Sequence, residues 1–192
     1  MTQRAPRVAI VGSGPSGLFA AQALLARDPD VLIDIVDKLP TPFGLLRYGV
    51  APDHTSIQAM QPRLAEPLRS ARVRFFGMVE FGTILTRADL VGSYDAVIYA
   101  AGASEDRRLG IEGEDLAGSR SAREFVAWYC GHPDAAPQSL AGVRSAMTFG
   151  VGNVAVDVAR VLSVASSHLA ATDMPRPVLD ELRASEVADV WV

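Results

Sequence analysis

The sequence lacks the features that mark several classes of protein. Its 192 residues include one cysteine, Cys130, so an intrachain disulfide and a C-x-x-C redox pair are both excluded. A chain without disulfides suits a reducing compartment. No apolar run approaches the ~20 residues that a membrane-spanning helix needs, and the first apolar segment reads as a strand rather than a signal peptide. We therefore expect a soluble, cytoplasmic protein with no membrane partner.

Positive charge is also scarce. The formal net charge of −4 argues against nucleic acid as the main partner. Hydrophobic residues make up 49% of the chain and charged residues 21%, which is ordinary for a globular protein. No cluster of metal ligands and no nucleophile triad is evident, so no metal site is predicted. One local basic run either attracts an acidic partner or forms a solvated face: Arg63, Arg69, Arg72 and Arg74.

A glycine-rich turn stands near the start of the chain. Residues 7–17 read RVAIVGSGPSG, an apolar run followed by Gly12, Gly14 and Gly17 in the spacing G-x-G-x-x-G. In a βαβ dinucleotide site the first glycine permits a tight turn, the second admits a pyrophosphate, and the third lets the helix pack on the strand. The N-terminus of the helix then attracts the phosphates. A glycine turn without a ligand is the alternative, and the flanking pattern makes it the less favoured one.

Asp37 completes this pattern. A helical segment and a second β-like run follow the glycines, and the run ends on Asp37, twenty residues after Gly17. An acid at this place accepts hydrogen bonds from an adenosine ribose and selects a 2′-hydroxyl over a 2′-phosphate. The first nucleotide is therefore expected to be FAD or NAD rather than NADP.

The middle of the chain holds a long loop and two further strands. Residues 38–56 are rich in proline and glycine and lack any helical or strand period, which is typical of a shaped, functional loop. A helix is expected from Ser56 to about Arg69, kinked or shortened by its prolines. Residues 73–82 are expected to form a strand. A buried strand is expected at 94–102, where small residues at its end would let a ligand come close.

The opening pattern then recurs. After a polar crossover at 103–119 and a helix capped by Ser121, residues 145–160 read SAMTFGVGNVAVDVAR, with Gly150, Gly152 and Ala155 in the accepted G-x-G-x-x-A variant. A helix at 178–183 and a strand at the end of the chain follow. This second nucleotide unit is begun and not finished, and its sheet would hold about two strands. The sequence therefore predicts the N-terminal part of a longer protein.

The motifs between the two glycine turns resemble one family. The string PTPFGLLRYGVAPDH at residues 40–54 is similar to the flavin-contacting loop of the adrenodoxin-reductase-type ferredoxin–NADP reductases, in particular actinobacterial ones. The segments SEDRRLGIEGEDLAGS, FVAWYCGHP and GVGNVAVDVAR resemble the same family. The resemblance covers essentially the whole chain in order. It implies an α/β fold with a Rossmann-like FAD-binding βαβ domain at 1–105, followed by the first half of a Rossmann-like NADP-binding domain at 106–192.

The resemblance also implies a reaction and its binding residues. NADPH would pass a hydride to FAD, and the flavin would pass single electrons to a ferredoxin-type iron–sulfur protein. The candidate FAD-binding residues are Gly12, Ser13, Gly14, Pro15, Ser16, Gly17, Asp37, Lys38, Gly44, Leu45, Val79 and Gly102. The candidate NADP-binding residues are Arg107, Gly150, Gly152, Asn153, Val154 and Ala155.

Two sites keep alternative interpretations. The resemblance places His54 beside the flavin–nicotinamide stack as the candidate catalytic residue, where it would polarise or relay a proton. The alternative interpretation, to which we give equal weight, is that His54 has a structural role and closes the loop by a hydrogen bond. Arg107 and Arg108 either bind a phosphate bidentately or form a solvated pair.

The chain also departs from the family. Thr55 stands where proline is common, and Asp37 stands where glutamate is common. The G-R-R-G-P-type segment that holds the 2′-phosphate and the C-terminal G-W segment that closes over the isoalloxazine are both missing. The rival interpretation is therefore a truncated, non-catalytic nucleotide-binding fragment of such a reductase. A thioredoxin-reductase-like dithiol enzyme is excluded by the single cysteine.

Overall fold

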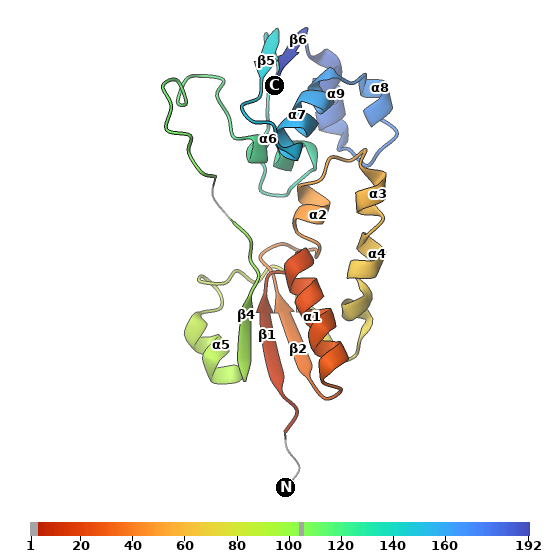
Figure 1. Ribbon diagram of the computed structural model, residues 1–192, viewed down its shortest axis with the longest axis vertical. Coiled ribbons are helices and arrows are strands. Elements are labelled where there is room, and N and C mark those ends of the chain that lie inside the picture. Colours follow the sequence, from red (N-terminus) through yellow and green to blue (C-terminus); the bar gives the residue numbers. More distant parts are fainter. Residues whose placement is uncertain (1–3, 104–105) are drawn as a thin grey trace. The chain divides into compact units, whose positions relative to one another are not determined.

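The computed structural model describes residues 4–103 and 106–192 and divides the chain into two compact units. The first unit comprises residues 4–47 and 59–103, and the second comprises 48–58 and 106–192 (Figure 1). The segment 48–58 thus belongs to the second unit, although both of its sequence neighbours belong to the first. The expected domain boundary at residue 105 lies outside the described residues and stays a prediction.

The first unit is built on a parallel sheet with the strand order β3-β2-β1-β4. Its strands are β1 (Arg7–Val11), β2 (Leu32–Val36), β3 (Val73–Phe76) and β4 (Ala96–Tyr99). Helix α1 (Pro15–Arg27) runs along one face (Figure 1), where Ile10 points toward Gly17. Because side chains alternate along a strand, Ala9 and Val11 face the opposite side and pack with Leu90 of α5 (Arg87–Ser93). Both faces of β1 are therefore covered, which explains its unbroken apolar run.

Two strands of this sheet are shorter than the sequence predicted. β3 ends at Phe76 because Met78 has a φ of 60°, in the left-handed region that interrupts an extended strand, so residues 77–82 are not part of it. β4 spans only Ala96–Tyr99, and the prediction that it is buried was wrong. It lies at the edge of the sheet with β1 as its strand neighbour, and Tyr99 is 52% exposed.

The single helix expected between Ser56 and Arg69 is three short segments. These are α3 (Thr55–Gln58), α4 (Gln61–Leu64) and the 3₁₀ turn η1 (Glu66–Arg69). Pro62 and Pro67 lie at the start of α4 and η1, where a missing backbone N–H leaves no hydrogen bond unmade. The short helices α2 (Leu45–Tyr48) and α5 were not predicted, although the capping box of Thr86 and Asp89 is a visible start signal for α5.

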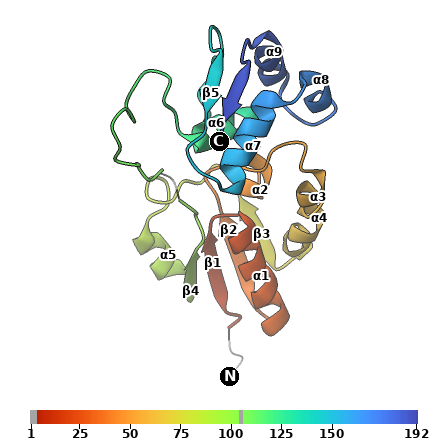
Figure 2. The same ribbon diagram turned by 45° about the horizontal axis from the view of Figure 1, so that its top comes forward.

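The second unit contains a two-stranded parallel sheet, as expected. Strands β5 (Ser145–Met147) and β6 (Asp189–Trp191) pair beside helix α7 (Asn153–Ser163) (Figure 2). The other helices are α6 (Ala122–Tyr129), α8 (Ser166–Leu169) and α9 (Arg176–Ala184). Ser121 caps α6 as predicted, because its hydroxyl accepts hydrogen bonds from the N–H groups of Arg123 and Glu124. The core joins α6, α7, α8 and α9 and includes Ala51 of the segment 48–58, which is fully buried.

A buried carboxylate joins two strands of the first sheet. Asp34 of β2 is 4% exposed and lies opposite Arg74 of β3, which donates two hydrogen bonds to it at 2.7 and 2.6 Å. The hydroxyl of Tyr94 donates a third at 2.7 Å. Burial by itself would raise the pKa of Asp34, but the bonds from Arg74 and Tyr94 and the charges of Arg74 and Arg7 outweigh it and lower the pKa. Within the described ranges no helix is long and apolar enough to cross a membrane.

This carboxylate makes stability depend on pH. A pKa lowered in the folded state stabilises the fold above the usual carboxyl pKa of ~3.9, and that contribution is lost as the pH falls through the folded-state value. Asp34→Asn should therefore lower the free energy of unfolding by about 1–3 kcal/mol at pH 7, and the deficit should shrink below pH ~4. Urea unfolding followed by circular dichroism at both pH values measures this. The exposed Asp30→Asn is the control, and an equal deficit at both pH values would contradict the assignment.

Candidate functional site

The first glycine turn joins β1 to α1 and is closely packed at two of its three glycines. Gly12 has a φ of +105°, and a Cβ atom added there would lie 2.3 Å from the carbonyl oxygen of Ala100. A Cβ atom on Gly17 would lie 2.0 Å from the oxygen of Gly12. Real Cβ atoms do not approach backbone so closely. Packing alone therefore requires glycine at Gly12 and Gly17, whatever the turn binds.

Gly14 is different, because no packing contact within residues 4–103 and 106–192 requires glycine there. Its φ is −69°, and an added Cβ atom would have the Cα of Gly44 as its nearest neighbour, at 4.0 Å. Gly14 is also the N-cap of α1, where no side chain caps the helix and the first turn holds no acidic residue. The first residues of the helix, Pro15 and Ser16, follow it directly. Open space beside uncapped N–H groups is the arrangement that a pyrophosphate needs.

The carboxylate of Asp37 is hydrogen-bonded to this turn. Its Oδ2 accepts hydrogen bonds from the backbone N–H of Ser13 at 2.7 Å and from the Ser13 hydroxyl at 2.5 Å, and its Oδ1 accepts one from the N–H of Leu39 at 2.9 Å. Ser13 is fully buried, so the carboxylate is held in one orientation. Oδ1 keeps capacity for a further hydrogen bond. The predicted ribose contact of Asp37 fits this geometry and stays a prediction.

Other candidate residues of the first unit gather around the same turn. Gly44 lies against Gly14, and the N–H of Val79 donates to the carbonyl of Asp37 at 2.9 Å. Gly102 has a φ of +73° just beyond β4, and Leu45 is 68% exposed at the start of α2. Lys38, which follows Asp37, is exposed. The turn lies at the carboxyl ends of parallel strands, where ligands of open α/β sheets bind.

The second glycine turn repeats the arrangement between β5 and α7. Gly150 has a φ of +132°, and its added Cβ would lie 3.9 Å from the Cβ of Ala155, an ordinary contact that explains why alanine suffices at the third position. Gly152 is the N-cap of α7, without a side-chain cap and without an acid in the first turn. A Cβ atom added at Gly152 would meet nothing within 4 Å. The first two helical residues, Asn153 and Val154, are exposed.

The arginines after the first unit differ in what they contact. Arg108 forms ion pairs with Glu114 and Asp115. Arg107 is exposed and forms no ion pair or hydrogen bond with the residues that the structure describes. Of the two, Arg107 therefore keeps its donors for a phosphate, and this role stays a prediction.

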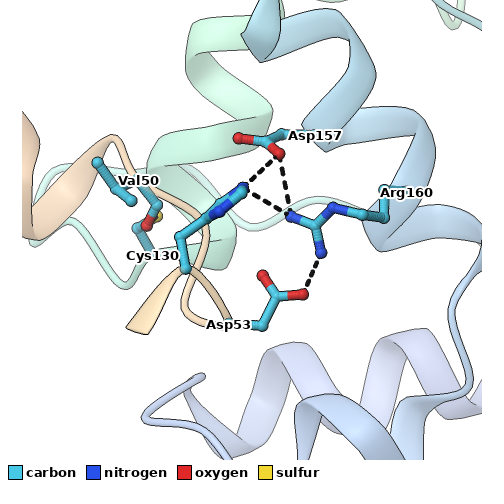
Figure 3. A network of polar contacts seen from close by, with 6 residues as sticks. Val50, Asp53, Cys130, Asp157 and Arg160 are labelled. Atoms are coloured by element: carbon cyan, nitrogen blue, oxygen red, sulfur yellow. Dashed lines mark hydrogen bonds and ion pairs between the residues drawn. The ribbon is translucent and has the colours of Figure 1, made fainter. Parts of the chain in front are cut away.

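His54 belongs to a cluster of polar side chains in the second unit. The other members are Asp53, Asp157 and Arg160, which are labelled in Figure 3. Its Nε2 lies 2.7 Å from Oδ1 of Asp157, and the same oxygen accepts a hydrogen bond from Nη2 of Arg160 at 3.0 Å. Nη1 of Arg160 donates to Oδ2 of Asp53. The other oxygen of Asp53 is buried and has no partner in the described part of the chain. The cluster thus ties the segment 48–58 to α7.

Both ends of the ion pair in this cluster are charged at neutral pH. Burial by itself would raise the pKa of Asp157, but hydrogen bonds from His54 and Arg160 and their charges lower it. Burial would lower the pKa of Arg160, but Asp53 and Asp157 raise it. Sequence analysis identified His54 and missed its three neighbours. The available signal was the pair Asp157 and Arg160, spaced i and i+3 among the valines of the helix that follows the second glycine turn.

Cys130 is a packing residue. Its Sγ donates a hydrogen bond to the carbonyl of Val50 at 3.2 Å, and burial raises the pKa of the thiol to about 12. A thiol in this state is not a nucleophile at neutral pH. Across residues 4–103 and 106–192, no group of three or more His, Cys, Asp or Glu side chains is arranged to hold a metal ion.

Residues 10–60, which contain the first glycine turn, match the family of NAD(P)-binding Rossmann-like domains. Among curated proteins, the NADPH-ferredoxin reductase FprA of Mycobacterium tuberculosis is 45% identical over 192 residues, covering 96% of this chain and 42% of the relative. The mitochondrial NADPH:adrenodoxin oxidoreductase of Homo sapiens is 42% identical over 193 residues, covering 99% of this chain and 39% of the relative. The chain thus spans about two fifths of the length of these relatives.

Solved structures agree with the sequence comparison. Mycobacterium tuberculosis FprA in complex with NADPH superposes with a TM-score of 0.91 at 44% identity, covering 97% of this chain and 43% of that one. Histamine dehydrogenase from Rhizobium sp. 4-9 has a TM-score of 0.62 at 17% identity and shares the fold alone.

The glycines of the first turn make a matched pair for mutation. Gly17→Ala places a methyl group against a backbone oxygen that cannot move away, so it should destabilise the protein by about 1–3 kcal/mol or more. Gly14→Ala enters open space and should change stability by less than about 0.5 kcal/mol. Thermal unfolding of both variants measures the difference. Equal destabilisation by the two would show that the turn is packed differently.

The similarity to these relatives extends over nearly all of this chain, and the fold and the two glycine turns accompany it. Both bacterial and mitochondrial relatives match it over nearly all of its residues. The resemblance expressed by the proline loop and the two turns is thereby confirmed. By sequence and fold, the chain is similar over nearly all of its residues to the adrenodoxin-reductase-type NADPH–ferredoxin reductases, of whose length it spans about two fifths.

Proposed function

We propose that this chain supplies the dinucleotide-binding parts of an FAD-dependent ferredoxin–NADP(+) reductase. FAD binds at the first glycine turn and NADP(H) at the second. One observation carries the proposal: each turn begins an uncapped helix with a glycine, Gly14 or Gly152, that packing does not require. A glycine kept where a side chain would fit is explained by a ligand that approaches the backbone closely.

The assignment of FAD to the first turn rests on two features. Asp37 favours a nucleotide with a free 2′-hydroxyl, and the loop at 40–54 resembles the flavin-contacting loop of the family. The NAD(P)-binding description of residues 10–60 fits the same βαβ fold and does not itself name FAD, which is proposed on these two features. For the second turn, the similarity to a protein whose structure holds NADPH supports NADP(H).

The proposed roles follow from the chemistry of each group. The flavin, when bound, supplies hydride acceptance and one-electron donation. The N–H groups at the start of α1 bind its pyrophosphate, and Asp37, held by Ser13, orients its adenosine ribose. The turn from Gly150 to Ala155 binds the phosphates of NADP(H), with Arg107 as a further phosphate ligand. His54 is the proposed catalytic residue, and a ferredoxin-type iron–sulfur protein is the proposed electron acceptor.

The alternative is a nucleotide-binding fragment without turnover. The fact that favours it is the length of the chain, which is about two fifths that of its relatives. NADPH-dependent reduction of cytochrome in the presence of added ferredoxin separates the two. Turnover supports the reductase, whereas bound flavin without turnover supports the fragment.

Binding itself can be tested at each turn separately. FAD is titrated by the quenching of its fluorescence, with NAD⁺ as competitor, and NADP⁺ is titrated by calorimetry. Gly14→Ala should weaken FAD binding at least tenfold, about 1.4 kcal/mol, with little change in NADP⁺ affinity. Gly152→Ala should do the reverse. FAD affinity unchanged by Gly14→Ala, or NAD⁺ displacing FAD at similar concentration, would contradict the assignment of the first turn.

A further inference from the structure

The two ring nitrogens of His54 have different surroundings. Nε2 lies 2.7 Å from Oδ1 of Asp157 and 3.2 Å from Nη2 of Arg160. Nδ1 has no hydrogen-bond partner among the residues that the structure describes, and the side chain is 37% exposed. A neutral imidazole carries one proton, so the neighbours of Nε2 decide which nitrogen holds it.

The carboxylate and the guanidinium make opposite demands on Nε2. A guanidinium only donates hydrogen bonds, so Arg160 favours an Nε2 without hydrogen. An ionised carboxylate only accepts, so Asp157 favours an Nε2 that carries hydrogen. At 2.7 Å, an Nε2 without hydrogen would face the carboxylate oxygen as a second acceptor, which is repulsive. The carboxylate is the nearer of the two groups, and Nε2 is therefore expected to carry the hydrogen.

The position of Asp157 is itself fixed. Nη2 of Arg160 donates to the same Oδ1 that faces His54, one helical turn along α7. Nη1 of Arg160 holds Asp53, the residue directly before His54. The guanidinium therefore holds both the carboxylate that receives the imidazole and the backbone that carries it. The contact of 3.2 Å between Arg160 and His54 is then a proximity of two donors that share one acceptor.

We propose that Asp157 is a positioning residue that holds the neutral imidazole of His54 in the tautomer protonated at Nε2, which leaves Nδ1 as the nitrogen that exchanges a proton. Its use in the reductase reaction rests on the proposed function, since His54 acts there only if the flavin binds. The tautomer itself is a property of this chain without cofactor.

The tautomer can be read directly by NMR. Long-range ¹H–¹⁵N correlation spectra of the chain at pH ~9, where imidazoles are ordinarily neutral, distinguish a protonated ring nitrogen from an unprotonated one. The chain has three histidines, and the loss of one pattern in His54→Gln assigns the signal. The expected result is an unprotonated Nδ1 and a protonated Nε2. A pattern protonated at Nδ1 would overturn the proposal.

Substitution of Asp157 gives a sharper test, because the neighbour that remains makes the opposite demand. In Asp157→Ala, Nη2 of Arg160 is left facing Nε2, and the pattern should shift to protonation at Nδ1. Asp157→Glu keeps a carboxylate and should restore protonation at Nε2. Arg160→Gln removes the competing donor and should also leave Nε2 protonated, and the exposed Arg183→Gln should change nothing.

Every result of these experiments either supports or overturns the proposed role of Asp157. A spectrum of Asp157→Ala that equals the original would overturn the role of Asp157. If Asp157→Ala does not fold, as judged by circular dichroism, the spectrum of the unaltered chain still decides the tautomer, and Asp157→Glu decides whether a carboxylate suffices. Because no cofactor is added, failure here is distinguishable from failure to bind FAD or NADP(H).

Discussion

The close approach of backbone to backbone at Gly12 is the constraint on which the first unit depends. The carbonyl oxygen of Ala100 occupies the place where any Cβ atom of Gly12 would lie, and the oxygen of Gly12 does the same to Gly17. These contacts seat the start of α1 on β1 and draw the end of β4 against the turn. Gly14 is left at the half-buried N-terminus of α1, where the helix has no side-chain cap for its first N–H groups. The geometry proposed to bind a pyrophosphate is thus a consequence of how closely the strands and the helix pack.

The two glycine turns reach the same result with different tightness. In the second turn the third position is Ala155, and its Cβ lies at an ordinary contact distance of 3.9 Å from the position of a Cβ on Gly150. The second turn therefore has room for a Cβ atom at its third position, where the first turn has none. What the turns share is the middle glycine, without a packing reason, at an uncapped helix end. That shared feature, rather than the glycine spacing, is the main support for the proposal that both turns bind a nucleotide.

Sequence was a good guide where structure depends on neighbours along the chain. The first βαβ unit, the cap at Ser121 and the second turn are local patterns, and the structure has them where they were predicted. Burial of β4 was mispredicted because an apolar run does not reveal whether a strand lies at the edge of a sheet. The cluster around His54 was out of reach, because Asp53 and Arg160 are separated by 107 positions and meet only through tertiary packing. A charged pair among valines was its one local trace.

The assignment of residues 48–58 to the second unit has a consequence for how the chain is made and cut. Ala51 belongs to the second core, and Asp53 holds Arg160 of α7. During synthesis this segment leaves the ribosome long before its partners, so it must wait, unpacked, until residues 106–192 follow. A gene fragment encoding residues 106–192 alone would lack part of the second core and would leave the half-buried Arg160 without the carboxylate of Asp53. The second unit is therefore not a module that can be excised as one stretch of sequence.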